Sequence, residues 1–357
     1  MLEGMEDEPL YYNAVATALH GDTRAIRRIR RATWRESYET LASDAHAAPA
    51  GTPPPEQAWD PLERHGIRLV LAGDPGFPEA LKGIPQPPLA LYIRGVLPVG
   101  TIEARPTVAI VGTRRGSPRG LRTAAVFGRA LAEAGCVIAS GLALGIDAAA
   151  HRGALEARGP CIAVIANGLS HVRPSTNARL AEMVLETGGC IVSEYPPDEE
   201  PLPQRFIERN RLISGFASGT LVIEAPERSG SLATADFALE QGREVFAVPG
   251  PIDDPLYRGS NGLIRQGATL VTKPNDILEA FGIAPAPSAP RSGPGGSREE
   301  TLIMKALESA SGALEVDKII TMTKLEPRIA IRTLGLLVVK NIARETGGGY
   351  ILETNYR

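Results

Sequence analysis

The stretch TVAIVGTRRGSPRGLRTAAVFGRALAEAGCVIASG, residues 107–141, decides the fold. It opens with the apolar, β-branched run 107–111, which is typical of a buried strand. A glycine- and arginine-rich loop follows, and Ser117 with Pro118 then forms a good helix start. The helical pattern ends before a second apolar run at 136–140. The stretch therefore predicts a strand–helix–strand unit with parallel strands.

The same alternation continues to residue 282. Further apolar runs read CIAVIANG, CIVSEY, TLVIEA, EVFAVPG and ATLVT, with helical patterns between most of them. Strands that are apolar along their whole length are expected in a parallel sheet covered on both faces. The sequence therefore predicts an α/β fold, a doubly wound, Rossmann-like parallel sheet.

Composition shifts predict four parts. Residues 1–48 read as a small helical domain of the SAM-like kind, and residues 60–283 as the Rossmann-like domain with a lead-in segment. Residues 284–297 are rich in Pro, Gly and Ser and are expected to be a linker. Residues 298–357 predict three helices, at 299–309, 314–322 and 327–340, and a hairpin, which is the order of a winged helix.

Bulk properties narrow the function classes. The net charge of −3 over 357 residues gives no global attraction to nucleic acid, so polyanion binding needs a local patch. Three scattered cysteines make no zinc or disulfide pattern, and we expect no metal and no cofactor. No apolar run reaches membrane-spanning length and no signal peptide is recognisable, so we expect a cytoplasmic protein without a membrane span.

Two local patterns leave alternatives open. The run Arg24, Arg27, Arg28, Arg30, Arg31 could contact nucleic acid, or it could be a solvated helix face, because acidic residues flank it. Asp147 and His151, spaced i, i+4, could form an acid/base pair or a local helix contact.

The segments after the predicted strands hold the candidate site, since ligands of doubly wound sheets bind at the carboxyl ends of strands. Gly, Ser, Thr, Asn and Arg dominate these segments, and such residues bind phosphate well. The first loop lacks G-x-G-x-x-G and no acidic residue ends the second strand, which argues against nicotinamide chemistry. Ser229, Gly230 and Ser231 could wrap a phosphate or simply cap a helix.

Taken together, AIVGTRRGSPRG, IASGLALGIDAAAHRGAL, FIERNRLISG, IEAPERSGSLATADFALEQGREVFAVPG and GSNGLIRQGA, in this order, resemble the DNA-processing protein A family (DprA, or Smf). The resemblance implies a non-catalytic protein that binds single-stranded DNA during natural transformation. It also implies protection of incoming strands, loading of the RecA recombinase, and a homodimer.

The resemblance also implies site residues. The strand-binding pocket of the family maps onto Arg114, Ser140, Gly141, Arg209, Asn210, Arg211, Ser229, Gly230 and Ser231, and Arg115 lies beside it at the mouth of the cleft. Where family members usually have Tyr-Pro, this chain has Arg173-Pro174. Arg173 could add a phosphate contact or pair with an acidic neighbour.

The stretch RFIERNR, residues 205–211, raises the question of what its arginines contact. Its arginines could face the phosphates of an extended strand, or pair internally with Glu194 or Glu224. Phe206 could stack on a base or anchor its helix in the core.

Two other functions compete. The Rossmann-like part also resembles nucleoside-monophosphate phosphoribohydrolases, but Phe237 stands where their catalytic glutamate is expected, and Asp236 is one position away. A transcription regulator is the second alternative, with Arg328, Arg332 and Lys340 of the predicted winged helix reading duplex DNA.

Overall fold

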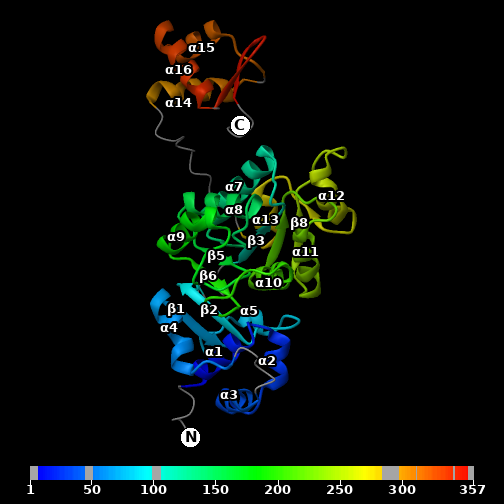
Figure 1. The fold of residues 1–357 in the computed structure, drawn as a ribbon. Coiled ribbons are helices and arrows are strands. Elements are labelled where there is room, and N and C mark those ends of the chain that lie inside the picture. Colours follow the sequence, from blue (N-terminus) through cyan, green and yellow to red (C-terminus); the bar gives the residue numbers. More distant parts are fainter. Residues whose placement is uncertain are drawn as a thin grey trace. The chain divides into compact units, whose positions relative to one another are not determined.

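The computed structural model describes residues 7–44, 51–98, 106–283, 297–310, 312–340 and 342–352. Contacts divide the chain into two compact units, Met1–Pro285 and Ala286–Arg357 (Figure 1). The predicted domain boundary at residue 48 lies outside the described residues, as does the predicted linker apart from Ser297.

A nine-stranded sheet organises the first unit. Its strands are β1 (Ile67–Leu71), β2 (Ala90–Gly95), β3 (Thr107–Val111), β4 (Val137–Ser140), β5 (Cys161–Val164), β6 (Cys190–Ser193), β7 (Gly219–Val222), β8 (Glu244–Ala247) and β9 (Thr269–Leu270). Their order is β1-β2-β6-β5-β4-β3-β7-β8-β9. The strands from β3 to β9 pair in parallel, which confirms the predicted α/β class.

The lead-in segment extends this sheet. β2 pairs antiparallel with both β1 and β6, so Tyr92 lies opposite Ser193. The sequence predicted a lead-in segment here but not its attachment to the end of the parallel sheet.

Helices cover both faces. Along β3, Val108 and Ile110 point to one hydrophobic cluster, and Ala109 and Val111 point to the other, as the period-2 alternation of a strand requires. The first cluster lies under α7 (Pro118–Glu133), α8 (Ile146–Glu156), α9 (Ala178–Glu186) and α13 (Pro274–Ala280). The second lies under α5 (Glu79–Lys82), α10 (Pro203–Phe216), α11 (Gly230–Glu240) and α12 (Arg258–Arg265). Short 3-10 turns occupy Ser175–Asn177 and Pro255–Tyr257.

Four helices adjoin β1 and β2, two of them in contact with β1 and two packed on the first helix. They are α1 (Glu8–Ala18), α2 (Thr23–Ile29), α3 (Trp34–Ser43) and α4 (Pro55–His65). The buried Asn13 donates to the Ala58 carbonyl at 2.7 Å and accepts from the Tyr92 hydroxyl at 2.9 Å. This bonding satisfies a buried amide and ties α1 to both α4 and β2.

The second unit has its own core. It consists of α14 (Arg298–Glu308), α15 (Val316–Thr323), α16 (Pro327–Val339) and the antiparallel pair β10 (Ala343–Thr346) and β11 (Gly349–Leu352). Ile303, Leu307, Ile319, Leu334 and Leu337 fill its centre. The three predicted helices and the hairpin are therefore present, in the order of a winged helix.

No helix within the described ranges is long and apolar enough to cross a bilayer.

Candidate functional site

The site residues gather at the carboxyl edge of β3, β4 and β7. β3 is the switch point of the sheet, because the chain continues from it to β4 on one side and reaches β7 on the other. α10 begins at this edge, since it leads from β6 back to the start of β7 (Figure 1). Loops after three strands and the first turns of α10 therefore share one surface.

Arg114 and Phe206 form the outward-facing part of this surface. The guanidinium carbon of Arg114 lies 4.5 Å from the centre of the Phe206 ring. Arg114 is exposed and Phe206 is half-buried, so both remain accessible. The pair presents a cation and an aromatic face side by side.

The backbone around Arg114 is held from two sides. The Thr113 amide donates to the Glu224 carbonyl at 2.7 Å, and the Thr113 carbonyl accepts from Ile146 at 3.3 Å. Gly145 has φ +80, and a Cβ there would come within 2.7 Å of the Arg114 backbone. The loop after β4 thus needs glycine to approach the loop after β3.

Arg115 is exposed, and its side chain has no recorded partner among the described residues. Its amide donates to the Thr113 hydroxyl at 3.2 Å, which stiffens the loop. Arg115 therefore offers a second free guanidinium beside Arg114.

The start of α7 is already occupied by an anion of the chain itself. Glu224, fully buried, accepts the Ser117 amide at 2.8 Å and also the Ser117 hydroxyl. Burial and a hydrogen bond to Glu224 raise the pKa of Tyr257 to about 12. Because this helix start is where Rossmann folds hold a pyrophosphate, the Glu224 carboxylate opposes dinucleotide binding there.

Arg209 lies below the surface. It is 4% exposed and donates to the carbonyls of Gly141, at 2.8 Å, and Val164. Its Nε donates to the Asn210 side-chain oxygen at 3.2 Å. Burial lowers the pKa of Arg209 to about 10, although the Asp147 carboxylate nearby works against this shift. Arg209 therefore braces the ends of β4 and β5.

Gly141 is fixed between two charged groups. Its amide donates to Asp147 Oδ2 at 3.2 Å, and a Cβ at this position would lie 2.7 Å from that oxygen and 2.8 Å from the Arg209 guanidinium. Burial raises the pKa of Asp147, while Arg209 and the Gly141 amide act in the opposite direction. Asp147 therefore holds the Gly141 backbone in place, a role that the sequence did not predict. Its place in the first turn after β4 was the available signal.

His151 does not pair with Asp147. Both ring nitrogens of His151 are buried, and within the described ranges neither makes a hydrogen bond of normal geometry; burial lowers its pKa to about 4, although the nearby Ser140 backbone acts in the opposite direction. Of the two alternatives for Asp147 and His151, a local helix contact matches this geometry and an acid/base pair does not.

Ser140 and Asn210 use their side chains inside the protein. The Ser140 hydroxyl is fully buried and donates to the Ile110 carbonyl at 2.6 Å. Asn210 donates to the Gly230 carbonyl at 3.0 Å and thereby joins α10 to the loop after β7. Both residues hold neighbouring segments in place.

The loop after β7 caps α11. Ser229 accepts the Ser231 amide at 3.3 Å, and the two hydroxyls lie 2.7 Å apart. Gly230 is exposed and Ser229 is half-buried. Ser229 therefore caps α11, and Gly230 still faces solvent.

Arg205 and Arg211 have internal partners. Arg211 pairs with Glu194 at 2.6 Å, and their side chains are 8% and 3% exposed. Arg205 pairs with Glu199 at 2.9 Å, donates to the Glu200 and His20 carbonyls, and lies 4.5 Å from the Tyr195 ring centre. Of the alternatives that the sequence left open, internal pairing holds for Arg211, with Glu194 as its partner.

Arg173 lies in the loop after β5 and pairs with Glu200 at 3.4 Å. Both side chains are largely exposed, so this pair is weak. Of the two alternatives for Arg173, the structure shows pairing with an acidic neighbour, Glu200.

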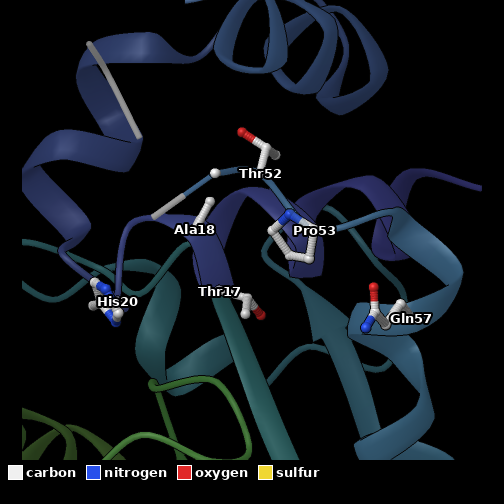
Figure 2. Close-up of a pocket in the computed structure, with 7 residues that line it drawn as sticks. Thr17, Ala18, His20, Thr52, Pro53 and Gln57 are labelled. Atoms are coloured by element: carbon white, nitrogen blue, oxygen red, sulfur yellow. The ribbon is translucent and has the colours of Figure 1, made fainter. Parts of the chain in front are cut away.

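A separate pocket is lined by residues at the end of α1, in the turn after it and in 51–57 (Figure 2). It has a volume of about 410 Å³ and lies between the end of α1 and the segment before α4, with Thr17, His20, Pro53 and Gln57 in its lining. None of the predicted site residues lines it. Within the described ranges, no group of three His, Cys, Asp or Glu side chains could hold a metal ion.

Comparisons with known proteins agree with this architecture. The family model described as DNA recombination-mediator protein A matches residues 68–282. Protein Smf of Escherichia coli (strain K12) is 47% identical over 232 residues, which cover 64% of this chain and 61% of that protein. The putative DNA processing protein DprA of Mycobacterium tuberculosis (strain H37Rv) is 34% identical over 307 residues, covering 81% of this chain and 78% of that protein.

Two solved structures are similar. DNA processing protein A from Streptococcus pneumoniae matches with a TM-score of 0.58 and 34% identity, covering 78% of this chain and 96% of that one. DNA processing protein A from Helicobacter pylori, whose structure is described as showing a single-stranded DNA binding mode, matches with a TM-score of 0.54 and 27% identity, covering 60% and 95%. Since the family model spans more than half of the chain, this protein belongs to the DNA recombination-mediator protein A family.

Proposed function

We propose that this protein binds single-stranded DNA at the carboxyl edge of β3, β4 and β7 and breaks no bond in it. The observation that carries the proposal is the accessible pair of Arg114 and Phe206 at this edge. A guanidinium can hold a phosphate while an aromatic ring stacks on a base, and neither contact depends on base identity. The description of the Helicobacter pylori relative as a single-strand binder supports the same assignment.

The site residues divide into two groups by accessibility. Arg114, Arg115, Phe206, Ser229 and Gly230 are exposed or half-buried, and we assign them direct contact with the strand. A second group is buried and is assigned to positioning the first; its members are Ser140, Gly141, Arg209, Asn210, Arg211 and Ser231. Arg173 is assigned to neutralising Glu200 at the rim.

The family assignment supports a cellular role. We propose that the protein acts in the cytoplasm during natural transformation, protects incoming strands and loads the RecA recombinase. The description of the family as recombination mediators supports this role. The chain spans about three fifths of the Escherichia coli relative, so these activities stand as proposals for the chain as a whole.

We also propose a homodimer. β9 is the last strand of the sheet, both of its residues are exposed, and Leu270 is 48% exposed. A free, partly apolar edge is suited to pairing with a second copy. Sedimentation of the full chain and of a Leu270→Lys variant would test this surface: a dimer that becomes a monomer supports it, and an unchanged mass contradicts it.

Competition binding tests the main proposal. A labelled single strand is bound first, and unlabelled single strand or duplex is then added. Displacement by single strand at far lower concentration than by duplex supports the proposal, whereas preference for a particular duplex favours a regulator. In the second unit, Lys340 pairs with Glu300 at 2.7 Å, which leaves fewer cations for duplex contact.

The hydrolase alternative is tested by base release from nucleoside monophosphates. Phe237 is half-buried, and Asp236 is exposed on α11. Neither residue supplies a buried carboxylate at the position expected of the catalytic glutamate. Turnover that an Asp236→Asn change abolishes would overturn the non-catalytic assignment.

A further inference from the structure

α2 and the residues after it carry a cluster of exposed arginines. They are Arg24, Arg27, Arg28, Arg30 and Arg31. Within α2, Ile26 is 1% exposed and packs in the core, while Arg24 and Arg28 lie on the opposite side, as the helical period dictates. Arg27 lies on the flank and donates to the Pro87 carbonyl. α2 is therefore amphipathic, with an entirely cationic outer face.

Three acidic residues around this run have other partners. Asp22 caps α2 by accepting the amides of Arg24 and Ala25, at 2.9 and 3.0 Å. Glu8 accepts the Trp34 amide at 2.7 Å, and Asp7 pairs with Arg35 at 3.0 Å. Within the described ranges, no ion pair is recorded for Arg24, Arg28 or Arg31. Of the acidic neighbours on which the solvated-face alternative rested, these three are engaged elsewhere, while Glu36 and Glu39 are exposed on α3.

The cationic face starts next to the proposed DNA site. The His20 ring lies 3.0 Å from Glu199, and the His20 carbonyl accepts from Arg205, the residue before Phe206 in α10. A Cβ on Gly21 would lie 2.9 Å from the Tyr195 ring, so the turn before α2 packs directly on the approach to α10. Arg24 follows His20 by four residues, a chain length that spans at most about 14 Å.

The segment between the two surfaces is largely neutralised. Glu199 is bound by Arg205 and His20, and Glu200 by Arg173. Only Asp198 of this loop remains exposed without a recorded ion pair. Between Phe206 and α2, a polyanion would therefore meet two exposed carboxylates without a recorded ion pair, Asp198 and Glu208.

We propose that Arg24, Arg28 and Arg31 form a second contact surface for the same single strand, holding phosphates of nucleotides beyond the strand-edge site. This inference rests on the proposed function. The nearby Trp34 ring is 6% exposed and lies under Arg30, so the surface offers charge without base stacking. Its contribution is therefore electrostatic and independent of base identity.

Oligonucleotide length separates the two surfaces. We would measure the affinity of the full chain for labelled oligothymidylates of about 6 and about 30 nucleotides, the first filling one site and the second able to reach further. The test variant is Arg24→Ser/Arg28→Ser/Arg31→Ser. The control Arg122→Ser/Arg152→Ser/Arg265→Ser removes the same charge from exposed positions on α7, α8 and α12.

The test variant should bind the long strand about tenfold more weakly, with a shallower dependence of log affinity on log salt by about 2, since each lost single-strand phosphate contact removes about 0.7. Its affinity for the short strand should not change. The control should match the wild type on both strands. Arg114→Ala should weaken binding of both strands.

The outcomes distinguish the two proposals. Equal long-strand affinities of test and control variants, with a short strand still sensitive to Arg114→Ala, would overturn the second surface alone. If Arg114→Ala leaves the affinity for both strands unchanged, the proposed function is overturned. If the triple variant unfolds, photo-crosslinking of a thiothymidine strand to the wild type decides: crosslinks in 20–33 support the surface, and crosslinks that leave this segment out contradict it.

Discussion

The guanidinium of Arg114 lies 4.5 Å from the centre of the Phe206 ring, and these residues come from different segments, the loop after β3 and the first turn of α10. Their contact depends on the topology of the sheet, which brings the end of β3 beside the start of α10. Arg209 fixes α10 to Gly141 in the loop after β4, and the bonds of Thr113 to Glu224 and Ile146 fix the loop after β3.

Phe206→Leu should weaken single-strand binding about 5- to 150-fold, because stacking of one base contributes about 1–3 kcal/mol. Leucine keeps the apolar volume but has no ring face. The salt dependence of binding should stay as in the wild type, since no charge is lost. Fluorescence anisotropy at two salt concentrations measures both quantities, and Phe206→Tyr, which retains the ring, serves as the control. An unaltered affinity of the leucine variant would assign Phe206 to the core alone.

Glu194→Gln should lower the free energy of unfolding by about 3–5 kcal/mol, because it leaves the Arg211 cation buried without its partner. Glu186→Gln removes the partner of Arg179 in a pair whose side chains are 71% and 59% exposed, and should change stability little. Urea unfolding followed by circular dichroism compares the two. Similar small losses in both variants would show that Arg211 finds solvent or another acceptor.

Gly120→Ala should destabilise the fold by about 1–3 kcal/mol, because a Cβ there would overlap the buried Glu224 carboxylate. Gly230→Ala is the matched control, also in the first turn of a helix. Its nearest neighbour would be the Ile207 side chain at 3.5 Å, an ordinary contact. Thermal unfolding of both variants measures the difference. A stable Gly120→Ala protein would mean that Glu224 can leave the start of α7.

Stability should fall as the pH is lowered from 6.5 toward 4, because burial lowers the pKa of His151 from 6.5 to about 4. In this window His151 binds a proton in the unfolded chain but not in the folded protein, so the free energy of unfolding rises with pH. The full contribution is at most about 3 kcal/mol. Urea unfolding of the wild type and of His151→Leu across this range isolates the effect. Parallel curves for the two proteins would contradict it.

The fold was largely predictable because its strands are short, apolar and β-branched. Runs such as 107–111 and 161–164 have few alternatives to a buried strand, and the helices between them follow from periodicity. The attachment of β1 and β2 was not predictable in the same way. It depends on pairing between Tyr92 and Ser193, residues far apart in the chain.

The site was predictable in place but less so in the roles of its residues. Glycine- and arginine-rich loops after parallel strands indicate an anion site whatever their detailed packing. Whether Arg211 meets a phosphate or Glu194 depends on how the loop after β6 folds back, and local sequence carries no signal for that. Glu224 likewise looks in the sequence like an ordinary carboxylate at a strand end, although it accepts the Ser117 amide at the start of α7 from the neighbouring strand.

The affinity for a short labelled oligothymidylate, measured for the wild type, Arg114→Ala/Phe206→Ala and the exposed-arginine control Arg122→Ala, tests the central claim most directly. We expect the double variant to bind at least about 30-fold more weakly, since a phosphate contact and a stacked base are both lost, and the control to bind like the wild type. Equal affinities of all three proteins, with each shown to be folded, would contradict the claim that the carboxyl edge of β3, β4 and β7 holds the strand.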